Sequence, residues 1–173
     1  MILTFGKRIE EDTYNGKDVN ADYVRIYWMK TFEEIRNDGE LVNRRLRESL
    51  ISGILDKVDA FDFTNTIAVH VRLGDFGANS LLISYYKSLI EQIHDRMPQY
   101  RFLLFSDGND SELAELSSMH FVQRVFVGSA IADIFGISSA KALIGSHSTF
   151  TDWGGYLGQI PHCCLKSLNM AHS

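Results

Sequence analysis

Short apolar runs alternate with segments of helical periodicity from about residue 61 to the end of the chain. The clearest run is Thr66–Val71 (TIAVHV), whose β-branched residues are typical of a strand buried on both faces. Further strands are expected at residues 101–105, 122–127 and 142–145, and residues 161–165 form either a last strand or an extended tail. Helices are expected between them at residues 80–97, 111–118, 129–139 and Thr149–Gly158. This alternation predicts βαβ units with right-handed crossovers and a parallel sheet.

The first 60 residues follow a different pattern. Apolar residues at helical spacing predict helices at residues 20–36 and 40–60, separated by the stop signal Asn37-Asp38-Gly39, and residues 1–5 suit a short strand. The length of 173 residues fits one ordinary domain and is short for two. We therefore predict an α/β protein in which a helical segment, residues 1–60, precedes a single Rossmann-like domain, residues 61–173, in one compact unit.

Charge and hydropathy exclude several function classes. The net charge of −5 and the pI near 5.6 argue against a broad basic face for nucleic acid. No apolar run approaches the roughly 20 residues that cross a bilayer. Residues 1–11 are too few and too charged for a signal peptide.

The two cysteines, Cys163 and Cys164, are adjacent. A disulfide between neighbours is strained, so we expect reduced thiols and a cytoplasmic protein. His162 beside them suggests zinc, but one local cluster does not close a tetrahedral site. We therefore predict no metal site.

Polar residues gather after three of the expected strands, at residues 72–75, 106–110 and 146–152. Ligands of open parallel sheets bind beyond the carboxyl ends of the strands. The three clusters are therefore expected on one rim, where they form a single site.

The cluster after the first strand suits an anion. Arg72 can bind phosphate oxygens with its guanidinium, and Gly74 allows close approach of the backbone. The alternative is a surface arginine in a turn, with Asp75 as a cap and His70 as a satisfied core histidine.

The cluster before the last helix suits a phosphate. Helix N-terminal amides, together with the hydroxyls of Ser148 and Thr149, bind phosphate without a lysine. The alternative is that these hydroxyls only cap the helix and that Phe150 belongs to the core. In the middle cluster, Asp107 and Asp110 offer carboxylates to a ribose, a guanine edge or a metal, and a plain polar turn is the default.

Four segments, in order, resemble motifs of the α-1,2-fucosyltransferases, a family related to α-1,6- and protein O-fucosyltransferases. They are His-Val-Arg-Leu-Gly-Asp from His70, Leu-Phe-Ser-Asp from Leu104, Asp-Ile-Phe from Asp133, and Ser-His-Ser-Thr-Phe-Thr-Asp-Trp-Gly-Gly-Tyr-Leu from Ser146. The resemblance covers roughly residues 60–160. It implies the C-terminal, nucleotide-sugar-binding half of a transferase of the GT-B type.

The resemblance also implies a chemistry. Members of the family have two Rossmann-like halves, invert the anomeric configuration of the sugar and need no metal or other cofactor. GDP-fucose binds in the C-terminal half. Carried over, Arg72 would hold the β-phosphate and assist departure of GDP, and His70 and Gly74 would shape its loop. Arg72 and His70 are thus the expected catalytic residues, and Asp75 is expected among the residues that bind the nucleotide sugar. Asp107 and Asp133 would face the guanosine. The diphosphate end would meet three further residues, Ser148, Thr149 and Phe150.

Two departures from the family pattern limit this carry-over. Leu73 stands where the motif has a second arginine. The resemblance does not extend to the family's N-terminal half, whose Gly-Gly-Leu-Gly-Asn-Gln type loop and much of the acceptor site we therefore do not expect in this sequence. Candidates for a general base among the residues present are Asp75, His147 and Asp152.

Three functions therefore remain open: a fucosyltransferase-type enzyme that uses a GDP-sugar donor and a glycan acceptor, a non-catalytic domain that binds GDP or a GDP-sugar, and a truncated, inactive transferase. Peripheral association with membrane glycan synthesis and a homodimer are further expectations. A cluster of aromatic residues either packs on the sheet, which we prefer, or forms the dimer surface: Tyr23, Tyr27, Trp28 and Phe32.

Overall fold

The computed structural model describes residues 8–10, 23–25, 36–50, 53–74 and 83–165. The chain divides into two compact units, Met1–Arg36 and Asn37–Ser173. In the first unit, β1 (Arg8–Glu10) and β2 (Tyr23–Arg25) form a parallel two-stranded sheet. Strand β2 corrects the expected helix over residues 20–36, and its Tyr-Val pair favours extended backbone. The rest of that expected helix and the strand predicted at residues 1–5 lie almost entirely outside the described residues.

The second unit is built on the predicted parallel sheet. Its strands are β3 (Thr66–Val71), β4 (Arg101–Ser106), β5 (Val122–Arg124), β6 (Ala142–Ser146) and β7 (His162–Leu165). They lie in the order β5-β4-β3-β6-β7, and every neighbouring pair is parallel. The α/β prediction is confirmed, and residues 162–165 form a strand rather than a tail.

The helices of the second unit fall close to the predicted segments. They are α1 (Gly39–Ser49), α2 (Ile54–Asp59), α3 (Ile83–Arg96), α4 (Ala114–Ser117), α5 (Ala130–Ser138) and α6 (Thr149–Gly158), preceded by the 3-10 turn η2 (Arg36–Asp38). The single helix expected over residues 40–60 is wrong. Gly53 has a φ of 91°, a left-handed conformation that glycine adopts without strain, and α2 starts anew after it.

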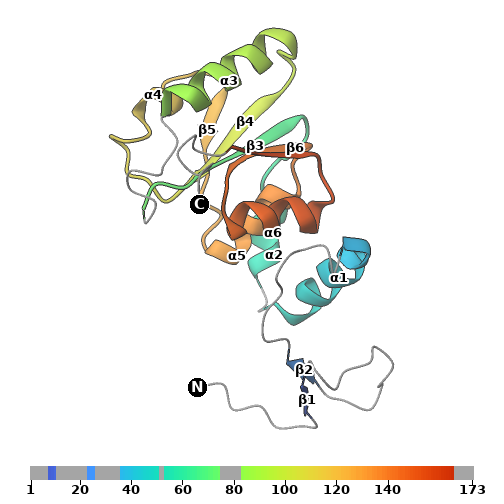
Figure 1. Cartoon of the computed structure of the whole chain (residues 1–173). Helices are drawn as coiled ribbons and strands as arrows, with labels where there is room; N and C mark the ends of the chain where they lie inside the picture. The colour runs from blue at the N-terminus through green and yellow to red at the C-terminus, as the bar shows by residue number, and fades with distance from the viewer. Residues whose placement is uncertain (1–7, 11–22, 26–35, 51–52, 75–82, 166–173) are drawn as a thin grey trace, which may run out of the picture. The chain divides into compact units, whose positions relative to one another are not determined.

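Helices cover both faces of the sheet, with α3 and α4 on one face and α2, α5 and α6 on the other (Figure 1). Side chains alternate along β3, so Ile67, Val69 and Val71 join the core beneath α3 and α4. His70, of the opposite alternation, contacts α6 through Thr151. Helix α1 belongs to this unit, because Asn43 Nδ2 donates a 2.6 Å hydrogen bond to the carbonyl of Leu157 at the end of α6. Among the described residues, no helix is long and apolar enough to cross a membrane.

Candidate nucleotide-sugar site

The strand order fixes where a ligand site can form. Strand β3 has β4 on one side and β6 on the other, so the chain winds in opposite directions from this point. Open α/β sheets bind ligands at such a switch, outside the carboxyl ends of the strands. All five strands are parallel, so the residues after β3, β4 and β6 share this edge. The described residues of the three polar clusters thus lie at one edge of the sheet, as the parallel sheet predicted from the sequence requires.

Asp107 organises the loop that follows β3. Its Oδ1 accepts the backbone N–H of Leu73 at 2.8 Å, and its Oδ2 accepts that of Gly74 at 3.1 Å. The same Oδ2 lies 3.2 Å from Nη1 of Arg72, and the two side chains are 33% and 30% exposed. A guanidinium has five donors and can bind a carboxylate and a phosphate together. Asp107 therefore holds this loop in place while the Arg72 guanidinium stays partly exposed to solvent.

Gly74 needs its lack of a side chain. A Cβ at this position would lie 2.7 Å from Oδ2 of Asp107, closer than real contacts allow. The next residue of the motif, Asp75, lies outside the described residues.

Ser146 joins the end of β6 to the end of β3. Its Oγ accepts the backbone N–H of Arg72 at 2.9 Å, donates to the His70 carbonyl at 3.3 Å and lies 2.8 Å from the hydroxyl of Tyr86 in α3. Burial raises the pKa of Tyr86, so the phenol is neutral in this network. The sequence placed Ser146 in a polar cluster and at the start of a motif without giving it a role, and it did not point to Tyr86. Tyr86 lies within the helix expected over residues 80–97, but no local pattern reveals the partner of its hydroxyl.

His70 is buried, with 4% of its surface exposed. Its Nδ1 lies 2.7 Å from Oγ1 of Thr151, and its ring stacks on Phe150 with centroids 4.7 Å apart. Burial lowers the pKa of His70 to about 4, so the imidazole is neutral at pH 7. His70 therefore fixes the start of α6 against the end of β3.

The N-terminus of α6 faces the same edge. Ser148 is its N-cap: the Oγ accepts the backbone N–H of Thr151 at 3.3 Å and lies 3.2 Å from Oγ1 of Thr151. Thr149, by contrast, is exposed. His70, Thr151 and Ser148 thus form a continuous hydrogen-bonded chain from the sheet to the helix N-terminus, which carries partial positive charge.

The loop between β5 and α5 completes the edge on the other side of β4. Asp133 accepts the backbone N–H of Val127 through Oδ1 at 2.6 Å. Burial raises the pKa of Asp133, and this hydrogen bond partly opposes the rise. In the same loop the Phe126 side chain is 70% exposed, which is unusual for phenylalanine. Sequence reasoning missed Phe126, because exposure of an isolated aromatic residue leaves no periodic signal.

Comparisons with known proteins identify a family and a fold. The family model described as Glycosyl transferase family 11 matches residues 27–171. A search of curated proteins gave no significant match. One similar solved structure is the NodZ α-1,6-fucosyltransferase soaked with GDP-fucose, with a TM-score of 0.52 and 19% identity over 77% of this chain and 51% of that one. Another is the UDP-GlcNAc 2-epimerase from Neisseria meningitidis bound to UDP-GlcNAc, with a TM-score of 0.53 and 13% identity over 72% of this chain and 35% of that one.

The two structural likenesses concern the fold, and this chain spans about half the length of the fucosyltransferase that it matches. The family assignment rests on the model that matches most of the sequence. The Rossmann-like sheet, with the Arg72 loop at its switch point, is consistent with this match. The chain belongs to glycosyl transferase family 11.

Proposed function

We propose that this chain forms the donor-binding part of a fucosyltransferase-type glycosyltransferase. The reaction would transfer a sugar, fucose in the first instance, from a GDP-sugar to a glycan acceptor, with inversion and without a metal ion. The observation that carries the proposal is the Arg72 loop, which Asp107 and Ser146 hold at the switch point between β3 and β6.

The electrostatics of this edge suit a departing nucleoside diphosphate. Breaking the bond between sugar and phosphate places negative charge on the β-phosphate. The Arg72 guanidinium and the α6 N-terminus, with Thr149 exposed at its first turn, offer fixed donors to that charge. Such donors need no reorganisation during the reaction. Gly74 leaves room for the Asp107 carboxylate that pairs with the arginine.

His70 fits a positioning role in this account. Its imidazole is buried, neutral and bonded to Thr151, and these features do not suit proton exchange with a substrate. Its contact with Phe150 keeps the helix N-terminus close to the Arg72 loop.

The loop between β5 and α5 suits the guanosine. Phe126 presents an exposed aromatic face, and stacking of a base on such a face contributes about 1–3 kcal/mol. Asp133 accepts the backbone N–H of Val127 and so fixes the conformation of that loop. We therefore assign Asp133 the role of shaping the pocket for the base.

A second candidate is a domain that binds a GDP-sugar without transferring it. Leu73 favours this candidate, because it stands in place of an arginine and leaves the loop one cation short of the family motif.

We also propose a cytoplasmic location, a role at the periphery of membrane glycan synthesis, and a homodimer. Sedimentation would test the homodimer.

Calorimetric titration with GDP, with ADP and UDP as controls, tests the nucleotide site. We expect selective GDP binding that Arg72→Ala weakens about tenfold to 100-fold, since a hydrogen bond to a charged group contributes about 1.5–3 kcal/mol. Arg101→Ala is the matched control, because Arg101 starts β4 at the opposite edge and pairs with Asp62. Equal affinity for all three nucleotides, or equal loss in both variants, would refute the site.

Transfer is tested separately from binding. GDP release from GDP-fucose, followed with and without a panel of glycan acceptors, should depend on an acceptor if the chain is a transferase. Tight GDP-fucose binding with no acceptor-dependent release would favour the binding domain.

A further inference from the structure

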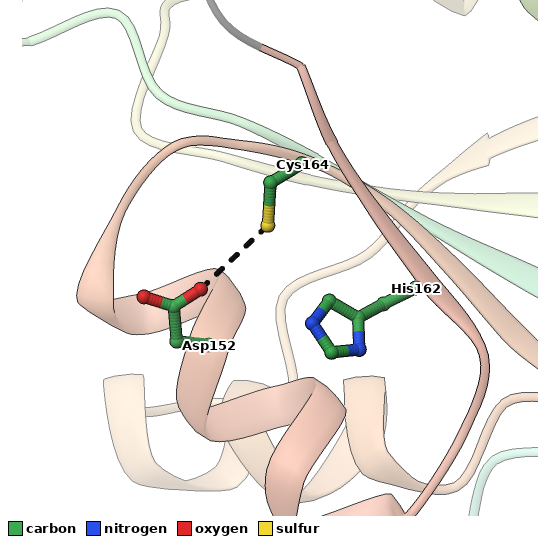
Figure 2. A group of neighbouring side chains, drawn as sticks. All are labelled: Asp152, His162 and Cys164. Carbon is green, nitrogen blue, oxygen red and sulfur yellow. Dashed lines mark hydrogen bonds between the residues drawn. The ribbon is translucent and has the colours of Figure 1, made fainter. Parts of the chain in front are cut away.

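Three side chains of different chemistry converge between α6 and β7. They are Asp152 in the first turn of α6 and His162 and Cys164 in β7 (Figure 2). One oxygen, one nitrogen and one sulfur atom from these residues all lie within 4.8 Å of one another. The Cys164 thiol donates a 3.6 Å hydrogen bond to Oδ1 of Asp152.

The fold brings these residues together for simple reasons. Strand β7 pairs with β6, and side chains along a strand alternate between faces, so His162 and Cys164 point to one side and Cys163 to the other. Gly155 in α6 makes room for the imidazole, because a Cβ there would lie 2.8 Å from Nδ1 of His162. The sequence showed the local His-Cys-Cys cluster but not the third residue, which arrives from α6.

The donor set selects the class of ion. Thiolate, imidazole and carboxylate together suit zinc, whereas calcium and magnesium prefer oxygen donors throughout. With Zn–S and Zn–O bonds of about 2.3 and 2.0 Å, two tetrahedral ligands lie roughly 3.5 Å apart. The distance of 3.6 Å between Sγ of Cys164 and Oδ1 of Asp152 matches this spacing. Cys164 and Asp152 are half-buried and His162 is exposed, so an ion can reach them from solvent.

We propose that Asp152, His162 and Cys164 bind one zinc ion, which ties the edge strand β7 to the first turn of α6. On binding, the thiol proton of Cys164 leaves to solvent and the sulfur becomes a ligand, and water fills the fourth position. The ion is separate from sugar transfer, which needs no metal in our account. Its binding would remove Asp152 from the candidates for a general base.

Cobalt(II) is the probe for this site, because a bond between cobalt and a thiolate gives a charge-transfer absorption band in the near ultraviolet. We expect the band to saturate at one cobalt per chain and zinc to displace it. Cys164→Ser should abolish the band, and Cys163→Ser, the matched control one residue away on the opposite face, should keep it. We expect Asp152→Asn and His162→Ala to weaken zinc binding at least tenfold in competition with a chelating dye.

Circular dichroism checks that each variant is folded. Asp152→Asn preserves side-chain size and gives the decisive comparison should Cys164→Ser fail to fold. Absence of the band in the folded chain would overturn the proposal. So would a band that Cys163→Ser removes and Cys164→Ser keeps, or zinc affinity that Asp152→Asn and His162→Ala leave unchanged. None of these results depends on GDP binding, so the outcome is independent of the proposed function.

Discussion

Thr151 links the buried His70 of β3 to the N-cap residue of α6. Its side chain is fully buried, and its hydroxyl lies 2.7 Å from Nδ1 of His70 and 3.2 Å from Oγ of Ser148. Replacing Thr151 by valine keeps the shape but removes the hydroxyl. His70 Nδ1 then has no partner in a buried setting, which costs about 1–3 kcal/mol.

Thr151→Ser is the matched control, because it keeps the hydroxyl and removes one methyl group. Loss of that methyl group costs about 1 kcal/mol. Urea unfolding followed by circular dichroism measures both variants. With a slope of about 2 kcal/mol per molar urea, a loss of 2 kcal/mol moves the midpoint by about 1 M.

We also expect Thr151→Val to bind GDP more weakly than Thr151→Ser, because the valine releases the α6 N-terminus from β3. An unfolding free energy of Thr151→Val within about 0.5 kcal/mol of the natural chain, combined with a larger loss for Thr151→Ser, would refute this role of the Thr151 hydroxyl. Packing of the methyl group would then hold this region, and the hydrogen-bonded chain would contribute nothing measurable.

Three further changes test other parts of the account. The pKa of His70 is about 4 in the folded chain against about 6.5 when exposed, so between these pH values the unfolded chain binds more protons. The contribution of His70 to the free energy of unfolding is complete above pH 6.5 and falls by about 3 kcal/mol as the pH drops to 4. Urea unfolding of His70→Gln should therefore show a free energy that depends less on pH. A pH dependence equal to that of the natural chain would contradict this. Gly145→Ala should lower the unfolding free energy by about 1–3 kcal/mol, because the new Cβ would collide with the Thr151 side chain, and an unchanged urea midpoint would disprove that contact. Phe126→Ala should leave stability within about 0.5 kcal/mol but weaken GDP binding about fivefold to 100-fold by calorimetry, and unaltered affinity would remove Phe126 from the base pocket.

Periodicity predicted most of the second unit correctly. The run Thr66–Val71 is a central buried strand, and α6 spans the residues expected from its capping serine and its apolar face. These predictions succeed because strand alternation and helix capping are local properties. The helix predicted over residues 40–60 failed, because apolar spacing continues across Gly53 although the backbone there turns left-handed.

The site was predictable in place but not in detail. Parallel strands bring Arg72, Asp107 and Ser148 to one edge, as the sequence indicated. That Asp107 binds the amides of the Arg72 loop depends on loop geometry, which no periodic signal encodes. The meeting of Asp152 with Cys164 depends on how α6 packs beside β7, and it joins residues 12 apart in sequence.

A crystal structure of the chain with GDP tests the central claim most directly. The account predicts the β-phosphate at the carboxyl edge between β3 and β6, within hydrogen-bond distance of the Arg72 guanidinium and near the N-terminus of α6. The base is predicted in the loop that holds Phe126. Nucleotide bound at another surface, or no nucleotide at concentrations that saturate the calorimetric titration, would contradict the account.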